Sequence, residues 1–267
     1  MSTFVTLGPE QPTIPLLVTV PHAGTDAPAE VAGRWTADAR RRPDTDWHLG
    51  LLYDFVPSLG AQLMIARNSR YVVDLNRSAD GAKLYAGRRE TGLVPTTTFS
   101  DEPIYLPGDE PGDFERADRI EQYWRPWHAA VRQRLDALRA QFGYAILFDA
   151  HSIVSEAPRF FDGRLPPLML GTVEGTSCDG RLSSAVQAVF EESPYGWALD
   201  APFKGGFITR SFGAPSDHIH ALQLEMSQRI YMDEGPPFVY QPQRAAGLKS
   251  WLLRALQALV DTSIHEG

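Results

Sequence analysis

Residues 144–152 read YAILFDAHS, and this stretch decides the predicted fold. Its first five residues form an apolar run that is typical of a buried strand. The run leads directly into Asp149, Ala150, His151 and Ser152, a group rich in side chains that bind metals or transfer protons. In open α/β sheets, ligands bind beyond the carboxyl ends of the strands, so this ending predicts a site at the sheet edge.

Two other apolar segments end in the same way. Residues 15–20 read PLLVTV and run into a turn that contains His22, and residues 221–225 read ALQLE and carry Gln223 and Glu225. Polar side chains from these distant strands are therefore expected to meet at one site. Further strands are predicted at 61–66, 70–75, 168–171 and 205–209, and helices at 44–56, 113–142, 181–192 and 245–260.

The alternation of predicted strands and helices indicates an α/β fold. The chain shows no repeat and no Ser/Gly linker, so we expect residues 1–267 to form a single domain. Pro126 is expected to kink or divide the helix at 113–142, and Gly143 to end it. Residues 78–112 are rich in Gly, Pro and Thr, which predicts a long loop that acts as a lid over the site.

Composition excludes several classes of protein. With 25 basic and 33 acidic residues the formal net charge is −8, which argues against a nucleic-acid-binding surface. No apolar run reaches the ~18 to 20 residues of a membrane span, and no secretory signal is visible, so a cytoplasmic protein is expected. Cys178 is the only cysteine, which excludes an internal disulfide framework and a metal site built from cysteines.

The polar residues at the strand ends suggest a metal. Catalytic zinc commonly takes three protein ligands from His, Asp and Glu and leaves a position for water. His22 and His151 supply two imidazoles, and Asp44 or Asp46, at the start of the predicted helix, supplies the carboxylate. The alternative is that these histidines are ordinary loop residues and that the aspartates cap the helix.

Two further carboxylates have candidate roles in such a site. Glu225 is expected to act as a general base that takes a proton from the metal-activated water, because a charged group that ends a mostly apolar strand is rarely buried unless it is paired or functional. Asp149 lies two residues before His151 in an extended chain and is expected to orient that imidazole, or else to form a turn. The sequence contains no HExxH, Walker, GxSxG or GxGxxG motif.

A second set of residues is cationic or amide-bearing and lies near strand ends: Arg70, Asn76, Arg77, Lys204 and Arg210. Arginine forks bind carboxylates in bidentate geometry, so the set favours a small anionic substrate. Taken one at a time, each of these side chains is equally typical of a solvated surface.

The sequence resembles the N-formylglutamate amidohydrolase (deformylase) family. The segments that carry the resemblance are VPHAG at 20–24, DTDWHLGLLYDF at 44–55, SRYVVDLNR at 69–77, DAHSI at 149–153, PFKGGFITRSFG at 202–213 and ALQLEMSQRIYMDE at 221–234. The resemblance implies a mixed, mostly parallel sheet flanked by helices, with the layout of zinc carboxypeptidases (phosphorylase/hydrolase-like). It also implies the hydrolysis of N-formyl-L-glutamate to formate and L-glutamate in histidine degradation.

The same resemblance implies roles for individual residues. Zn²⁺, or another divalent transition metal, would be held by His22, Asp46 and His151, with Asp46 chosen over Asp44 because it matches the family motif better. Glu225 falls at the position of the base in carboxypeptidase-like enzymes. The substrate carboxylates would bind Asn76 and Arg77, with Arg70 and Arg210 as further candidates, and Asp149 and Asp44 would support the ligands.

One feature departs from the carboxypeptidase pattern, in which the first His and the acidic ligand are three residues apart. Here His22 and Asp46 are 24 residues apart, so the chain must return the carboxylate to the metal. Two alternative functions remain: a zinc deacylase or carboxypeptidase-like hydrolase acting on another N-acyl amino acid, and a non-catalytic ligand-binding module of the same fold.

Overall fold

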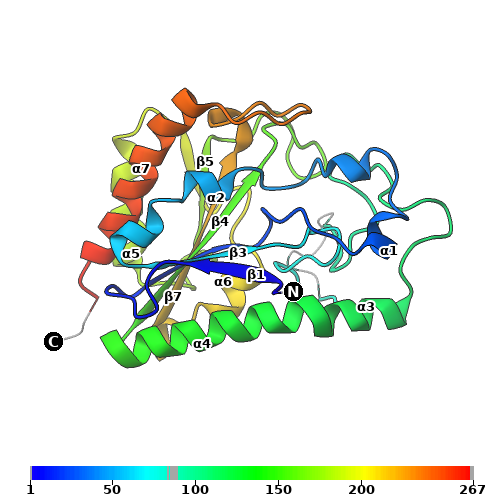
Figure 1. Ribbon diagram of the computed structural model, residues 1–267. Coiled ribbons are helices and arrows are strands. Elements are labelled where there is room, and N and C mark those ends of the chain that lie inside the picture. Colours follow the sequence, from blue (N-terminus) through cyan, green and yellow to red (C-terminus); the bar gives the residue numbers. More distant parts are fainter. Residues whose placement is uncertain (1, 83, 85–89, 265–267) are drawn as a thin grey trace.

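A seven-stranded sheet runs through the centre of the molecule in the computed structural model, which describes residues 2–82, 84 and 90–264 (Figure 1). In spatial order the strands are β1 (Phe4–Leu7), β3 (Gln62–Ala66), β2 (Leu16–Val20), β4 (Ala145–Ile153), β7 (Ile219–Ser227), β5 (Leu168–Gly171) and β6 (Trp197–Leu199). The pairs β1–β3 and β7–β5 are antiparallel, and the other neighbouring pairs are parallel. The predicted single-domain α/β fold with a mixed, mostly parallel sheet is confirmed.

Helices cover both faces of this sheet. The α-helices are α1 (Ala29–Ala32), α2 (Leu49–Leu52), α3 (Asp113–Arg119), α4 (Arg125–Phe142), α5 (Gly180–Glu191), α6 (Phe207–Phe212) and α7 (Pro242–Asp261). The 3₁₀-helices are η1 (Ala39–Arg41), η2 (Val56–Leu59), η4 (Pro215–Asp217) and η5 (Gln228–Ile230), and η3 (Ile120–Trp124) is a π-helical turn. None of the helices in these described ranges has the length and apolar character that a bilayer crossing needs.

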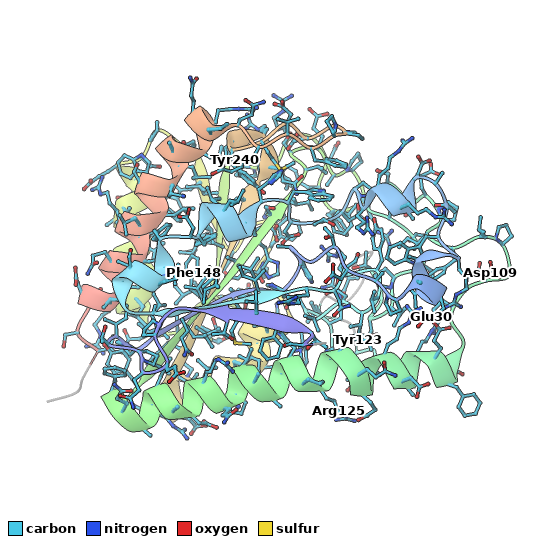
Figure 2. All side chains as sticks on the ribbon, viewed as in Figure 1. Glu30, Asp109, Tyr123, Arg125, Phe148 and Tyr240 are labelled. Atoms are coloured by element: carbon cyan, nitrogen blue, oxygen red, sulfur yellow. The ribbon has the colours of Figure 1, made fainter. Side chains whose placement is uncertain are left out.

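The two faces of the central strands pack into two separate cores. Side chains of β4 alternate, so that Ile146 and Phe148 pack with α2, α5 and α7, whereas Ala145 and Leu147 pack with α4 and α6. Figure 2 shows Phe148 inside the molecule and Arg125 projecting outward from the start of α4. All nine residues of β4 are buried, as expected for a parallel strand covered on both faces.

The register of the central strands sets the position of the polar residues. Asp149 of β4 lies opposite Thr19 of β2 and Gln223 of β7, and His151 lies opposite Glu225. The predicted strand at 144–148 is therefore longer than expected, because β4 continues to Ile153 and carries its polar residues within the sheet. The polar residues of β4 and β7 meet at one edge, as the sequence predicts.

The prediction of a helix over 44–56 is wrong for its first part. Residues 44–48 form a loop, and the one-turn helix α2 begins only after His48, which has a left-handed φ of 64°. Neither Asp44 nor Asp46 caps this helix, because each carboxylate accepts hydrogen bonds from distant parts of the chain.

Two predicted strands are also absent. The segment at 70–75 is a series of turns in which the Asp74 carboxylate accepts a hydrogen bond from the backbone of Asn76, and Tyr71 and Val72 enter a small core of their own. The segment at 205–209 is instead the start of α6, where the Gly206 N–H donates to the side chain of Gln223 rather than to a neighbouring strand. In both segments a side chain replaces the sheet as the hydrogen-bond partner.

The long helical segment at 113–142 is present, and Gly143 ends it with φ 83°. The π-turn η3 separates α3 from α4 directly before Pro126, which lies in the first turn of α4. Trp124 of this turn donates to the Arg77 carbonyl at 2.8 Å, and His128 of α4 donates to the Leu75 carbonyl at 2.9 Å. The helix therefore holds the turns at 70–77 from one side.

We expect His128 to make the protein sensitive to acid, because burial lowers the pKa of its imidazole to about 4. The unfolded chain binds a proton below about pH 6.5, whereas the folded chain does not until about pH 4, so stability falls as the pH falls between these values. Between pH 7 and 5 the loss from this group is about 2 kcal/mol. The His128→Gln variant keeps a donor but should lack this loss in urea unfolding of the metal-free protein. An equal pH dependence in both proteins would contradict the prediction.

Candidate metal and substrate site

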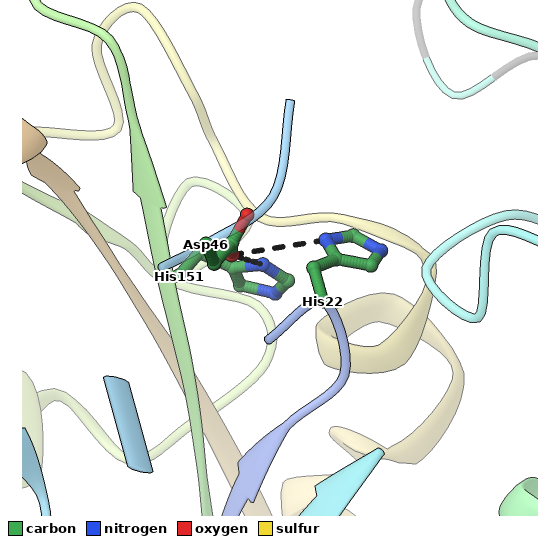
Figure 3. A group of neighbouring side chains, drawn as sticks. All are labelled: His22, Asp46 and His151. Carbon is green, nitrogen blue, oxygen red and sulfur yellow. Dashed lines mark hydrogen bonds and ion pairs between the residues drawn. The ribbon is translucent and has the colours of Figure 1, made fainter. Parts of the chain in front are cut away.

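Three side chains of types that commonly bind metals converge at the edge of the sheet (Figure 3). His22 follows β2, Asp46 lies in the loop before α2, and His151 lies in β4. All three are buried, and their ligand-type atoms lie within 4.8 Å of one another. The Asp46 Oδ2 atom is 3.2 Å from His151 Nδ1 and 3.8 Å from His22 Nδ1.

Each imidazole is oriented by a carboxylate on its other nitrogen. His22 Nε2 donates to Asp74 at 2.8 Å, and His151 Nε2 donates to Asp149 at 2.7 Å. Asp149 in turn accepts a 2.6 Å hydrogen bond from the Thr19 hydroxyl. With a proton on Nε2 of each ring, Nδ1 is the atom left to bind a metal at the centre of the cluster, and on His151 the metal would replace the proton shared with Asp46.

The donor set fits a divalent metal. His22 Nδ1 and Asp46 Oδ1 are buried and have no hydrogen-bond partner among residues 2–82, 84 and 90–264, although buried polar atoms normally have one. Two imidazole nitrogens and a carboxylate oxygen are a common set for catalytic zinc and also suit other transition metals. A cation at this point would satisfy both orphaned atoms at once.

The electrostatics of the cluster also favour a cation. Burial and nearby Arg70 lower the pKa of His22, although Asp74 opposes them. For His151 the effect of burial is outweighed by Asp149 and Asp46, which raise its pKa well above the ordinary value. The carboxylates around the cluster therefore favour a positive charge at its centre, which a bound metal ion would supply.

Asp46 reaches the cluster through a loop that folds back on the first histidine. Its backbone N–H donates to the His22 carbonyl at 3.0 Å, and its Oδ2 accepts from the Ser152 N–H at 3.1 Å. On either side of it, Gln228 donates to the Thr45 carbonyl and Tyr231 donates to the Trp47 carbonyl. These contacts explain how a carboxylate 24 residues from His22 returns to the same point.

Asp44 lies apart from the ligand atoms and has a different set of partners. Its Oδ2 accepts from the Tyr71 hydroxyl at 2.8 Å and from the Phe99 N–H at 2.9 Å. Burial raises the pKa of Asp44 to about 6. It ties the loop at 90–105 to the wall of the site.

Glu225 lies beside the cluster and lines the same cavity as the three candidate ligands. Burial and the charge of Asp46 raise its pKa to about 8, while His151 and Arg70 act in the opposite direction. A carboxyl group with a pKa near neutrality is suited to proton transfer.

The cavity has a volume of about 320 Å³ and is lined by cations and aromatic rings. Arg70 donates to Asp74 at 2.7 Å and lies 3.7 Å from Asp46, with its guanidinium over the Phe99 ring. Arg77 donates to the carbonyl and hydroxyl of Thr91 and to the Asn76 carbonyl. Among the described residues, three arginines, Arg70, Arg77 and Arg159, therefore line this cavity together with the carboxylates of Asp46, Glu90 and Glu225.

Asn76 is placed by a close contact with Gly206. Its Oδ1 accepts from the Ile208 N–H at 2.8 Å, and its amide nitrogen lies 3.1 Å from His151 Nε2. A Cβ atom on Gly206 would overlap the Asn76 amide, which explains why glycine occupies this position.

The structure does not bring every predicted residue to the site. Arg210 donates to the Gly205 carbonyl, Lys204 pairs with Glu174, and neither is among the described residues that line the cavity. Sequence reasoning missed Asp74 and Arg159. Asp74 lies in the quoted segment SRYVVDLNR, four residues after Arg70, whereas nothing in the sequence marks Arg159.

Comparisons with known proteins identify the family. The family model of N-formylglutamate amidohydrolases matches residues 14–232. The chain belongs to this family. A crystal structure of N-formylglutamate amidohydrolase from Ralstonia eutropha JMP134 superimposes with a TM-score of 0.81 at 27% identity, covering 97% of each chain.

Two curated relatives support the same assignment to the N-formylglutamate amidohydrolase family. The N-formylglutamate deformylase of Pseudomonas putida is 48% identical over 94% of each chain. That of Pseudomonas aeruginosa is 44% identical over 92% of this chain and 93% of its own. This family member is thus a hydrolase that acts on an amide bond.

We expect the Gly206→Ala substitution to lower activity by at least about tenfold, as misplacement of a positioned side chain does. The added methyl group displaces Asn76 from Ile208 and His151, while the backbone at 206 has a negative φ that alanine accepts. Gly196→Ala is the matched control, because its Cβ would lie 3.6 Å from Pro167, an ordinary contact. Equal steady-state rates for both variants would contradict the role of this contact.

Proposed function

We propose that this protein hydrolyses N-formyl-L-glutamate to formate and L-glutamate with the aid of a bound divalent metal, zinc. The observation that carries the proposal is the convergence of the His22 and His151 Nδ1 atoms on the Asp46 carboxylate at the wall of an arginine-lined cavity. Two atoms of this group, His22 Nδ1 and Asp46 Oδ1, have no hydrogen-bond partner among the described residues. The family, whose named members are N-formylglutamate deformylases, supplies the substrate.

His22, Asp46 and His151 would hold the metal, and Asp74 and Asp149 would keep the two imidazoles in the required tautomer. When bound, zinc supplies Lewis-acid polarisation and lowers the pKa of water toward ~7. The nitrogen and oxygen donor set does not depend on the single cysteine, Cys178, which is buried elsewhere.

Glu225 is the proposed general base. It takes one proton from the attacking water as the new C–O bond forms at the formyl carbon. It then gives that proton to the nitrogen of glutamate as the C–N bond breaks, so that formate and the free amine leave. Burial raises the pKa of Glu225, and the positive charge of a bound metal would oppose this rise and favour the carboxylate that accepts the proton.

The cavity cations suit a substrate with two carboxylates. Arg70 lies beside Asp46 and is the proposed donor to the negative charge that develops on the formyl oxygen. Asn76 and Arg77 are the proposed partners of the α-carboxylate, which lies close to the scissile bond. Arg210, outside this cavity, has no part in the proposal.

The described part of the loop at 78–112 is tied to the site rather than separate from it. Thr91 holds Arg77, and Phe99 packs on Arg70 and donates to Asp44. Residues 83 and 85–89 lie outside the described residues. As the resemblance implies, we place the reaction in histidine degradation; the cytoplasmic location expected from the sequence stays a prediction.

The direct test is formate release from N-formyl-L-glutamate by the purified protein. Activity should fall to background after dialysis against a chelator and return when zinc is added, because the metal polarises the reacting carbonyl. Larger activity on N-acetyl- or N-succinyl-glutamate would favour a different deacylase, and binding without turnover would favour a ligand-binding module. Activity that survives complete metal removal would exclude the proposed mechanism.

The Glu225→Gln variant should bind metal normally and lose about 10²- to 10⁴-fold in kcat, the usual contribution of a positioned general base. Metal content is measured by elemental analysis and kcat by formate release. Glu156→Gln is the control, because Glu156 is exposed and pairs with Arg164 away from the cavity. Full activity in the Glu225→Gln variant would remove Glu225 from the mechanism.

A further inference from the structure

Arg159 lines the cavity and takes no part in the reaction steps above. It lies in the connection between β4 and β5, and its side chain is only 8% exposed. Its Nη1 atom donates to the Thr97 hydroxyl and the Thr98 carbonyl at 2.9 Å and to Asp101 at 3.0 Å, and its Nη2 atom donates to the Glu90 carbonyl at 2.9 Å. These contacts hold the guanidinium in one place at the wall of the cavity.

One edge of the Arg159 guanidinium carries N–H groups that are available to a ligand. Within the described part of the chain, the Nε atom is buried without a hydrogen-bond partner, and Nη2, which has two N–H groups, has one partner. Nε and Nη2 form the side edge of the guanidinium, which binds a carboxylate through two parallel hydrogen bonds. A buried donor without a partner in a ligand cavity indicates a group that the ligand satisfies.

The surroundings of Arg159 strengthen such a contact. The Phe160 ring packs edge-to-face with Phe99 at 5.0 Å and contacts Phe203 at 6.3 Å, and all three rings line the cavity. Asp101, which pairs with Nη1, is 42% exposed, so water screens its charge. In an apolar environment an arginine attracts a carboxylate more strongly than it does in water.

The position of Arg159 distinguishes it from the other two cavity arginines. Arg70 contacts Asp74 and Asp46 of the metal cluster, and Arg77 follows Asn76, which contacts His151. The partners of Arg159 include none of these cluster residues. Arg159 is therefore the cavity arginine whose hydrogen bonds to described residues leave out the metal cluster, which makes it the candidate partner for the part of a substrate farther from the scissile bond.

We propose that Arg159 binds the side-chain carboxylate of the substrate and selects N-formyl-glutamate over N-formyl amino acids with neutral side chains. In N-formyl-glutamate the α-carboxylate lies one carbon from the scissile nitrogen and the side-chain carboxylate lies three carbons from it. The connectivity assigns the near carboxylate to Asn76 and Arg77 and the far one to Arg159. This inference rests on the proposed function.

The test compares kcat/KM for N-formyl-L-glutamate and N-formyl-L-glutamine, which has nearly the same shape but no side-chain charge. Arg159→Gln should lower kcat/KM for N-formyl-glutamate by about 100-fold, the size of a lost charge-assisted pair, mainly through KM. The value for N-formyl-glutamine should change by less than about threefold, since a hydrogen bond to a neutral amide contributes little. The ratio of the two values does not depend on how much of the variant folds.

Two further variants complete the design. Arg159→Lys keeps the charge but loses the fork, so its selectivity should fall between those of the wild type and Arg159→Gln. Arg164→Gln is the matched control, because Arg164 lies on the same connection, is 60% exposed and does not line the cavity. Arg77→Gln should lower kcat/KM for both substrates together.

An equal loss for both substrates in Arg159→Gln would mean that Arg159 only supports the loops, and an unchanged ratio with full activity would remove it from the site. Either result would overturn the inference while leaving the deformylase activity intact. Failure of the wild-type protein to release formate from either substrate would instead refute the proposed function.

Discussion

The hydrogen bonds from two buried imidazoles to two buried carboxylates are the interaction on which the site depends. His22 donates to Asp74 and His151 donates to Asp149, so both rings are fixed in rotation and in tautomer. Without these bonds either ring nitrogen could carry the proton, and the lone pairs would not be directed to one point. The same bonds place negative charge behind each ring, which makes the Nδ1 atoms better donors to a cation.

The sheet makes this arrangement possible, because parallel strands bring distant residues to one edge. The β2–β4 register places Thr19 beside Asp149, whose orientation the threonine hydroxyl fixes. The β4–β7 register places Glu225 beside His151. His22 and its partner Asp74 come from loops instead. The sheet therefore supplies half of the cluster, and the segments at 22–46 and 70–77 supply the rest.

The sequence predicted the parts of the molecule whose signals are local. Apolar runs identified β2, β4 and β7, and His22, His151, Gln223 and Glu225, which follow or end these runs, line one cavity. The segments at 44–56 and 70–75 were predicted wrongly because their conformation depends on side chains far away in the sequence. Asp46 accepts a hydrogen bond from the Ser152 N–H, 106 residues away, and Asp74 accepts one from His22, 52 residues away; no periodicity encodes these contacts.

The same reasoning explains why Arg159 could not be found from the sequence. Its neighbours in the chain carry no pattern, and its partners are two backbone carbonyls, a hydroxyl and a carboxylate that lie 58 to 69 residues away. Arginines such as Arg70 and Arg77 stand out because they flank a segment that resembles a family motif. Arg159, the proposed partner of the outer part of the ligand, lies in no segment that resembles a family motif, so its neighbours in the sequence do not mark it.

The arginines that line the cavity differ in whether carboxylates of the protein already balance their charge, and this difference distinguishes substrate binding from the reaction itself. The net charge of −8 opposes an anionic substrate over the whole surface, yet three arginines line one cavity. Arg70 is compensated by Asp74 and lies near Asp46, so its charge belongs to the metal cluster and acts where negative charge develops during reaction. The hydrogen bonds of Arg77 to described residues go to neutral groups, so no carboxylate among them is hydrogen-bonded to its guanidinium before a substrate binds. A dianionic substrate neutralises the outer cations, whereas the inner one is already balanced before the substrate arrives.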